Sequence, residues 1–382
     1  MKFSFTDEQV MLGDTSAGFL GTTAPLSRVR DIMVSASGFD AALWQQLCAD
    51  MYWQAILVPE AQQGLGLGLV ESVIVLEQMG MRLTPVPLAG VMAAALALRT
   101  CADMPRRQEL LASIGAGRLV CLAHTAARPH WDEQGVEIRA TRTSDGWQLD
   151  GEARFVPAGH VADDLLVVAR TGDGLALFHV RPDQAGVQRV KTPTLDQTRA
   201  MAGLSLDRVV VEPAACLAEP WAGLASVLGF ARIFSGAEQV GCAQASLDQS
   251  VAYTAERVQF GRTIASYQAI KHKAADMMLK AESARSLLYY AACVGDDWLA
   301  GRCDDDALEE AAAMLGSAAG DAAFFCSGTG IQLHGGVGIT EEYDIQLYFK
   351  RAQSLHAYLG RPDELRETLA AMLLDGEVIH AA

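Results

Sequence analysis

Two segments of the C-terminal half decide the fold, and they read Arg257-Val-Gln-Phe260-Gly261-Arg262, followed by Tyr267-Gln268, and Gln332-Leu-His-Gly335-Gly336-Val-Gly338-Ile-Thr340. Arg257 offers a planar fork of N–H donors that suits phosphate oxygens. Gly335 and Gly336 carry no side chain, so backbone N–H groups there can approach a ligand closely. Gln268 and Gln332 can form neutral hydrogen bonds. Both segments therefore suit a ligand that combines phosphate groups with neutral polar groups.

Long helices are expected on either side of these segments. One apolar stripe at helical spacing runs towards Arg257, and it consists of Phe230, Ile233, Phe234, Ala237, Val240, Leu247 and Val251. Similar patterns predict further helices over Met277 to Ala300, Ala307 to Phe325 and Pro362 to Leu374. Long helices with apolar faces favour a four-helix bundle in residues 220–382.

Strands are expected in the middle of the chain, and helices again before it. The apolar period changes to two after Leu119, and the predicted strands are Val136 to Arg142, Gly146 to Val156, Asp164 to Arg170, Gly174 to Val180 and Leu204 to Val211. No helical segment separates them, which predicts an antiparallel β-domain over 119–219. Residues 1–118 read as helical. The fold class is α+β and mostly α, in the order helical, β, helical.

Composition limits the partners of the chain. The 382 residues carry a net charge of −16, and such an acidic surface repels nucleic acid and anionic membranes. The eight cysteines are scattered singly, which supports neither a disulfide framework nor a metal site. The opening Thr6-Asp7-Glu8-Gln9 is a helix start rather than a secretory signal, and no long apolar run predicts a membrane helix. We expect a cytoplasmic protein.

The two opening segments resemble the Arg-x-x-Phe-Gly…Gln and Gln-x-x-Gly-Gly-x-Gly motifs of acyl-CoA dehydrogenases. The opening Phe-Thr-Asp-Glu-Gln and the run Val58-Pro59-Glu60 with Gly64-Leu-Gly66 are similar to that family as well. The resemblance spans essentially the whole chain in the right order. It implies the acyl-CoA dehydrogenase fold, FAD as cofactor, an acyl-CoA substrate and an electron-accepting flavoprotein as partner. In the family, the residues that match Arg257, Phe260, Gln268, Gln332, Gly335 and Gly336 reach the adenosine and pyrophosphate of FAD held mainly by a neighbouring subunit.

The catalytic carboxylate of the family has no counterpart here. Its usual place, the Glu of Tyr-Glu-Gly-Thr, corresponds to Leu359 in Tyr358-Leu359-Gly360-Arg361. The alternative place, before a helix arginine that matches Arg232, corresponds to Ala231. Glu238 lies about two helical turns after Ala231 on nearly the same face, but about 10 Å further along the axis. Glu238 is therefore the first candidate for a non-standard base, against the alternative of a buried glutamate paired with a cation.

The flavin-facing motifs of the β-domain have changed too. The family's Thr-Glu-Pro-Gly-x-Gly-Ser-Asp is replaced by the stretch from His124 to Asp132, and its Trp-Ile-Thr by Phe155-Val156-Pro157. Proline offers neither a hydroxyl nor an N–H to a flavin. His124 and His130 are candidates for a catalytic role, although a structural role is the commoner one for such histidines.

These losses favour one hypothesis and leave two others open. The chain resembles base-lacking subunits of heteromeric α2β2 acyl-CoA dehydrogenases, known from sterol side-chain and dicarboxylic acid degradation, and would complete the FAD site of a base-bearing chain. It could instead be a self-sufficient homo-oligomer that uses Glu238. A flavin-free scaffold on the same fold is the third reading. The small residues Ser235, Gly236, Ala237 and Gly241 suggest room for a bulky acyl group, or merely close helix packing.

Overall fold

The computed structural model describes residues 4–126 and 130–380. By internal packing the chain divides into two compact units. We call residues 1–30, 69–84 and 232–382 the bundle unit, and residues 31–68 and 85–231 the sheet unit. The predicted order of helical, strand and helical segments is confirmed.

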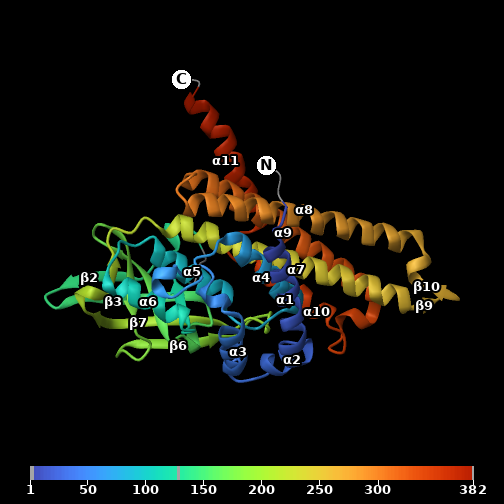
Figure 1. Ribbon diagram of the computed structural model, residues 1–382, viewed down its shortest axis with the longest axis horizontal. Helices are drawn as coiled ribbons and strands as arrows, with labels where there is room; N and C mark the ends of the chain where they lie inside the picture. The colour runs from blue at the N-terminus through green and yellow to red at the C-terminus, as the bar shows by residue number, and fades with distance from the viewer. Residues whose placement is uncertain (1–3, 127–129, 381–382) are drawn as a thin grey trace. The chain divides into compact units, whose positions relative to one another are not determined.

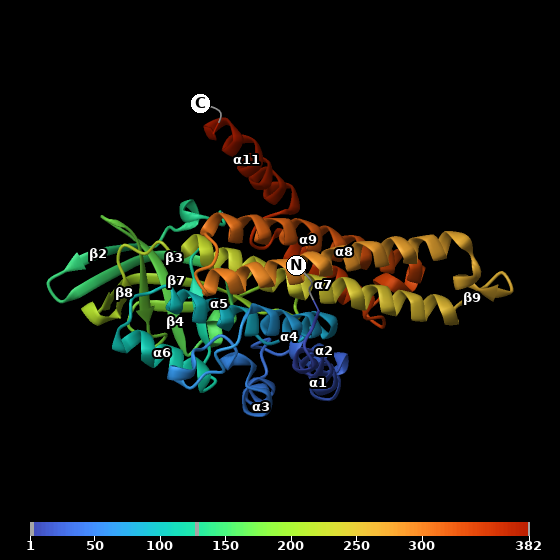
Figure 2. The same ribbon diagram turned by 45° about the horizontal axis from the view of Figure 1, so that its top comes forward.

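The bundle unit is built from long helices (Figures 1 and 2). Its helices are α1 (Asp7–Thr23), α4 (Leu69–Arg82), α7 (Leu224–Glu256), which enters the unit at residue 232, α8 (Gln268–Leu299), α9 (Asp305–His334), α10 (Ile345–Ala357) and α11 (Pro362–His380), with α2 (Leu26–Met33) at its margin. Helix α1 starts with the expected capping box, because the Thr6 hydroxyl accepts from Gln9 N and the Gln9 side chain accepts from Thr6 N. Helix α9 packs against α8, α10 and α11.

Small residues allow the helices of this unit to approach closely. A Cβ added at Gly236 would come within 2.7 Å of Leu315, and one at Gly241 within 2.0 Å of the Glu77 carbonyl oxygen. Both distances are shorter than real Cβ contacts, so helix packing requires glycine at both positions. These two glycines are therefore accounted for by packing and carry no information about the size of an acyl group.

The sheet unit contains an eight-stranded sheet and shorter helices. The helices are α3 (Ala41–Met51), α5 (Leu88–Arg99) and α6 (Pro105–Gly115), with single turns η1 (Trp53–Ala55), η2 (Glu60–Gln62), η3 (Glu133–Gly135), η4 (Gly159–Val161) and η5 (Pro213–Ala215). The strands are β1 (Val120–Ala123), β2 (Arg139–Thr143), β3 (Gly146–Pro157), β4 (Asp164–Thr171), β5 (Gly174–Val180), β6 (Val187–Thr192), β7 (Met201–Val211) and β8 (Cys216–Ala218). Their order is β6-β7-β3-β2-β4-β5-β8, and β1 pairs with β4.

The sheet is mixed rather than purely antiparallel, which corrects the expectation from sequence. β1 runs parallel to β4, with Val120 opposite Asp164 and Ala123 opposite Val167. All four residues of β1 are buried, as is typical of a strand covered on both faces. β2 also meets β4 in parallel at Arg139. The remaining neighbours are antiparallel.

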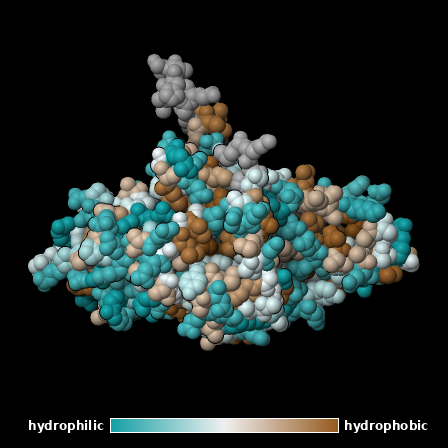
Figure 3. All heavy atoms as spheres, viewed as in Figure 1, coloured by the Kyte–Doolittle hydropathy of each residue, from teal (hydrophilic) through white to brown (hydrophobic). Residues whose placement is uncertain are grey.

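No helix in the described part of the chain is long and apolar enough to cross a membrane. Within residues 4–126 and 130–380 no three histidine, cysteine or carboxylate side chains gather as metal ligands, and the eight cysteines are free thiols. The face drawn in Figure 3 is mostly hydrophilic, with small apolar patches between charged residues.

Candidate functional site

A short hairpin follows α7 and carries the first of the two sequence motifs. Its strands are β9 (Val258–Gln259) and β10 (Arg262–Thr263), which pair antiparallel. The turn residues Phe260 and Gly261 have φ of 51° and 80°, so both adopt the left-handed conformation that a tight hairpin turn requires. Phe260 is 92% exposed, so packing against the described residues does little to offset this strain. Its aromatic ring is therefore open to solvent at the tip of the hairpin.

The second motif lies where α9 ends. Gly335, with φ of 67°, turns the chain out of the helix and begins η7 (Gly335–Ile339). Gly338 is needed for packing, since a Cβ there would lie 2.7 Å from the Ile331 carbonyl oxygen. Gly336 has neither a positive φ nor any atom within 4 Å of an added Cβ. Gly336 therefore presents an open backbone face at the end of α9, to which no described atom lies close.

Tyr253 joins the two motifs. Its ring stacks on His334 with centroids 4.2 Å apart, and its hydroxyl donates to the His334 carbonyl oxygen at 3.3 Å. Tyr343 packs edge-on against both rings. The structure thus fastens the last turn of α7, just before Arg257, to the last residue of α9, just before Gly335.

All six residues predicted to bind the cofactor belong to the bundle unit, and all are exposed; they are Arg257, Phe260, Gln268, Gln332, Gly335 and Gly336. The Arg257 side chain forms no ion pair with any described residue. Its backbone is held by two hydrogen bonds, one from its N–H to the Tyr253 carbonyl oxygen and one from the Ile264 N–H to its own carbonyl oxygen. Arg262 lies 3.9 Å above the Tyr267 ring, just before Gln268 begins α8. These unpaired donors and open glycines fit the pyrophosphate and adenosine of a dinucleotide. We call this exposed surface the hairpin–glycine surface.

The two places where the family carries its base hold apolar residues in a packed environment. Leu359 is 1% exposed and has φ of 67°. Its carbonyl oxygen accepts a hydrogen bond from Arg232 Nε at 2.9 Å. Arg232 Nη1 in turn binds both carboxylate oxygens of Glu309, at 2.6 and 2.7 Å. Ala231 directly precedes Arg232 in α7.

A small cavity of about 10 Å³ lies beside Leu359, room for about one water molecule. It is lined in part by Ser235, whose buried hydroxyl has no hydrogen-bond partner within the described residues. Arg361, which replaces the family's threonine, forms an exposed ion pair with Asp363.

Glu238 is buried beside a cation. Its carboxylate is 3% exposed and lies 3.6 Å from Nη1 of Arg351 on α10, which is 2% exposed. A buried arginine on another helix therefore faces the acid that the sequence singled out. This is the arrangement expected of a structural ion pair.

The flavin-facing segments of the sheet unit pack against each other through aromatic rings. Trp131 lies 5.9 Å from His124 and 6.1 Å from Phe155, measured between ring centroids. Pro157 is buried at the end of β3, opposite Met201. Of the segment from His124 to Asp132, residues 127–129 lie outside the described residues.

The two histidines of that segment differ in their surroundings. Burial lowers the pKa of His124 from 6.5 to about 4, so its ring is neutral at neutral pH. Its Nδ1 has no hydrogen-bond partner among the described residues. His130 is exposed, and its carbonyl oxygen accepts from the Thr125 hydroxyl. Among the described residues of this region, Trp131 and Phe155 offer aromatic packing, and Pro157 offers neither a hydroxyl nor an N–H to a flavin, so Pro157 does not fit the contact that the family's threonine makes.

Comparison with known proteins identifies the family. The chain matches the acyl-CoA dehydrogenase N-terminal domain over residues 6–118 and the C-terminal domain over residues 221–374. It belongs to the acyl-CoA dehydrogenase family, a family of FAD-dependent oxidoreductases.

Three relatives extend along nearly the full chain. Acyl-CoA dehydrogenase IpdE2 of Mycolicibacterium smegmatis is 31% identical over 366 residues, covering 96% of this chain and 99% of its own. A variant of the Tcur3481-Tcur3483 steroid ACAD superposes with a TM-score of 0.87 at 29% identity, covering 97% and 99% of the two chains. The ChsE4-ChsE5 complex of Mycobacterium tuberculosis gives 0.86 at 26% identity, covering 98% and 99%.

Proposed function

We propose that this chain is the FAD-completing subunit of a heteromeric acyl-CoA dehydrogenase. In this proposal it supplies the adenosine and pyrophosphate half of the FAD site to a different chain, and that chain carries the catalytic carboxylate. FAD, when bound, accepts the hydride from the β-carbon of the acyl-CoA. This chain contributes binding and orientation rather than proton abstraction.

The environment of Leu359 is the observation that carries the proposal. A base must reach the α-proton with a side chain that can accept it. Leu359 is apolar and buried, and the backbone around it is held by the Arg232–Glu309 pair. Both carboxylate oxygens of Glu309 already accept hydrogen bonds from Arg232, so Glu309 is engaged within the chain.

The hairpin–glycine surface supports the other half of the proposal. Arg257 has its guanidinium free of carboxylates in the described structure, and Gly336 has an open face. The backbone at Arg257 and at Gly336 already has its position in the single chain. Less conformational entropy is therefore lost when a ligand binds there. Random loss of function would not spare this surface while removing the base and the flavin-facing hydroxyl.

The relatives favour a two-chain enzyme and a large substrate. The Tcur3481-Tcur3483 steroid ACAD and the ChsE4-ChsE5 complex are each described by two differently named chains. By analogy we propose an α2β2 assembly that acts on the CoA thioester of a sterol-derived acid and passes electrons to an electron-accepting flavoprotein. This extension rests on likeness rather than on a feature of the site.

The test is to substitute Arg257 in the assembled enzyme. The chain is co-expressed with a base-bearing acyl-CoA dehydrogenase chain, and Arg257→Gln is compared with Arg208→Gln, an exposed arginine of the sheet unit. We expect the Arg257 variant to assemble normally but to lose FAD at least tenfold more readily, since a charge-assisted bond contributes about 1.5–3 kcal/mol. Arg208→Gln should leave FAD binding unchanged. Equal FAD retention in both variants would refute the proposed role.

A further inference from the structure

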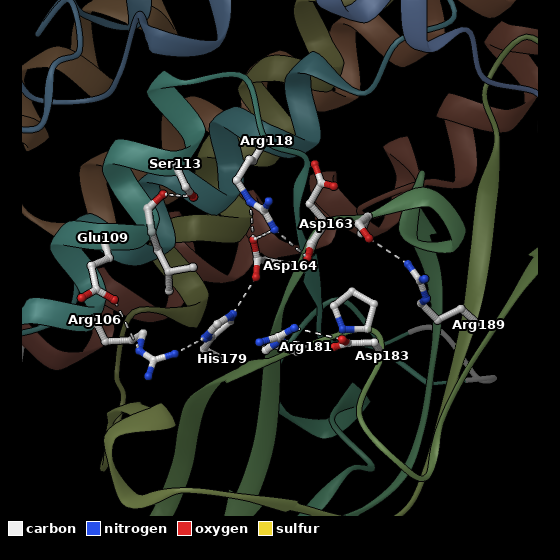
Figure 4. Close-up of a pocket in the computed structure, with 13 residues that line it drawn as sticks. Arg106, Glu109, Ser113, Arg118, Asp163, Asp164, His179, Arg181, Asp183 and Arg189 are labelled. Atoms are coloured by element: carbon white, nitrogen blue, oxygen red, sulfur yellow. Dashed lines mark hydrogen bonds and ion pairs between the residues drawn. The ribbon is translucent and has the colours of Figure 1, made fainter.

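A polar cleft in the sheet unit involves none of the candidate-site residues described above. Its volume is about 610 Å³, within the usual range of small-molecule sites. It lies between α6 and the strands β4, β5 and β6, and Figure 4 shows four arginine side chains around it, from Arg106, Arg118, Arg181 and Arg189. Four carboxylates, from Glu109, Asp163, Asp164 and Asp183, line the same cleft, so a free cation depends on which arginine donors these acids leave unused.

The floor of the cleft is a buried chain of hydrogen bonds. Asp164 Oδ1 lies 2.9 Å from Nε2 of His179, and Asp164 Oδ2 accepts from Arg118 Nε at 3.0 Å. Burial opposes ionisation of Asp164, but the hydrogen bonds from His179 and Arg118 outweigh it and lower its pKa. An ionised Asp164 accepts a hydrogen bond from the Nε2–H of His179, so the unprotonated Nδ1 accepts one from Arg106 Nη1 at 3.2 Å. Arg106 Nη2 also bonds Glu212, which fixes the guanidinium in place.

The rim carries arginine donors that the protein leaves unused. Arg189 donates through Nη1 to the carbonyl oxygens of Gly159 and Ala162, and it forms no ion pair with the described residues. Arg181 uses Nε and Nη2 on Asp183, so its Nη1 remains available. Arg118 likewise spends only Nε and Nη2 on protein acceptors. Three guanidinium groups thus keep N–H donors at one cleft.

We propose that this cleft binds a small molecule of nucleotide size that carries a phosphate monoester. Converging guanidinium groups suit the three oxygens of a phosphate better than a single carboxylate. Leu110, Ala162 and Pro182 add apolar wall for the rest of the ligand. Such a site stands apart from the hairpin–glycine surface, because every residue that lines it belongs to the sheet unit.

Calorimetric titration of the full-length chain tests the proposal, with inorganic phosphate, AMP and coenzyme A as the three probes. We expect one molecule of AMP or coenzyme A per chain, and weaker binding of inorganic phosphate. Arg181→Gln and Arg189→Lys should each weaken that binding about tenfold or more, as expected for one charge-assisted bond to a phosphate. Arg181 is 64% exposed and pairs only with its neighbour Asp183, so its loss leaves the buried floor intact. If coenzyme A binds and AMP does not, the ligand is a coenzyme A; if both bind alike, the adenosine phosphate is what the cleft recognises.

One further variant tests whether the effect is specific to the cleft. Arg208→Gln removes an exposed arginine elsewhere in the sheet unit, and it should bind the probes within twofold of the unaltered chain. The proposal is overturned if no probe binds at millimolar concentration, if inorganic phosphate binds as tightly as the larger probes, or if Arg208→Gln loses affinity as the cleft variants do.

Discussion

Replacing Glu238 with glutamine separates a structural ion pair from a catalytic base. Glu238 and Arg351 are both more than nine-tenths buried, and their charged atoms are 3.6 Å apart. At an effective dielectric constant of about 20, two unit charges at that distance attract by roughly 4–5 kcal/mol. Removing one member of a buried pair typically costs about 3–5 kcal/mol, because the other charge stays buried. We expect Glu238→Gln to lower the unfolding free energy of the bundle unit by about 3 kcal/mol.

The assay is chemical unfolding by urea of the variant alongside Glu367→Gln, an exposed glutamate of α11 in the same unit. The control should unfold at the same urea concentration as the unaltered chain, and Glu238→Gln at a clearly lower one. Replacing Glu238 and Arg351 together by leucine should recover part of the loss, since a buried pair can be exchanged for apolar packing at little cost.

The activity of the same variant tests the second hypothesis, that Glu238 is the catalytic base. If Glu238 is a structural residue, the assembled enzyme that contains Glu238→Gln keeps its turnover per bound FAD at temperatures where the chain stays folded. Full stability together with loss of turnover would show that Glu238 is a base and that the structural reading of the pair is wrong.

Three further outcomes are expected. Phe260→Gly should change the unfolding free energy by less than about 1 kcal/mol, because relief of the left-handed strain offsets the greater entropy of the unfolded chain. The same variant should raise the FAD dissociation constant of the assembled enzyme. Leu359→Glu should not produce acyl-CoA-dependent dye reduction in the isolated chain. It should destabilise the chain in urea, because a carboxylate would replace a side chain that is 1% exposed. His124 binds its proton more weakly in the folded chain than in the unfolded one, because burial lowers its pKa from 6.5 to about 4. The contribution of the neutral ring to the unfolding free energy is therefore fully present above pH 6.5 and is lost as the pH falls towards 4. The loss should amount to about 2 kcal/mol between pH 7 and pH 5. His124→Phe should remove this dependence, as urea midpoints at the two pH values would show.

Long periodic helices were the part of the fold most open to prediction from sequence. The apolar stripe before Arg257 predicted α7, which the structure extends back to Leu224. Helix α8 begins at Gln268 rather than at the expected Met277, because its first turns are largely exposed and carry no apolar period. Helix α10 (Ile345–Ala357) is not among the helices predicted from the sequence.

The strands that escaped prediction lack alternation of buried and exposed residues over enough length. β1 is four buried residues, and a short apolar run does not distinguish a strand from a helix end. β8 has three residues, and β6 places no fully buried residue in its six. Pairing in three dimensions, rather than local preference, makes these segments strands.

The residues of the candidate site also differ in whether the sequence alone could predict them. Local motifs were enough to nominate Arg257, Phe260 and Gly336, because each signals its chemistry within a few residues. The partner of Glu238 could not be predicted, since Arg351 lies on a different helix more than a hundred residues away. The Asp164–His179 contact that underlies the cleft likewise needs β4 and β5 to be paired first.

The flavin content of the purified chain tests the central claim most directly. Absorbance near 450 nm and total protein give the number of FAD molecules per chain, first for this chain alone and then for its complex with a base-bearing acyl-CoA dehydrogenase chain. The account predicts almost no FAD in the isolated chain and one FAD for each pair of unlike chains in the complex. One FAD per subunit in the isolated chain, together with reduction by an acyl-CoA, would contradict it.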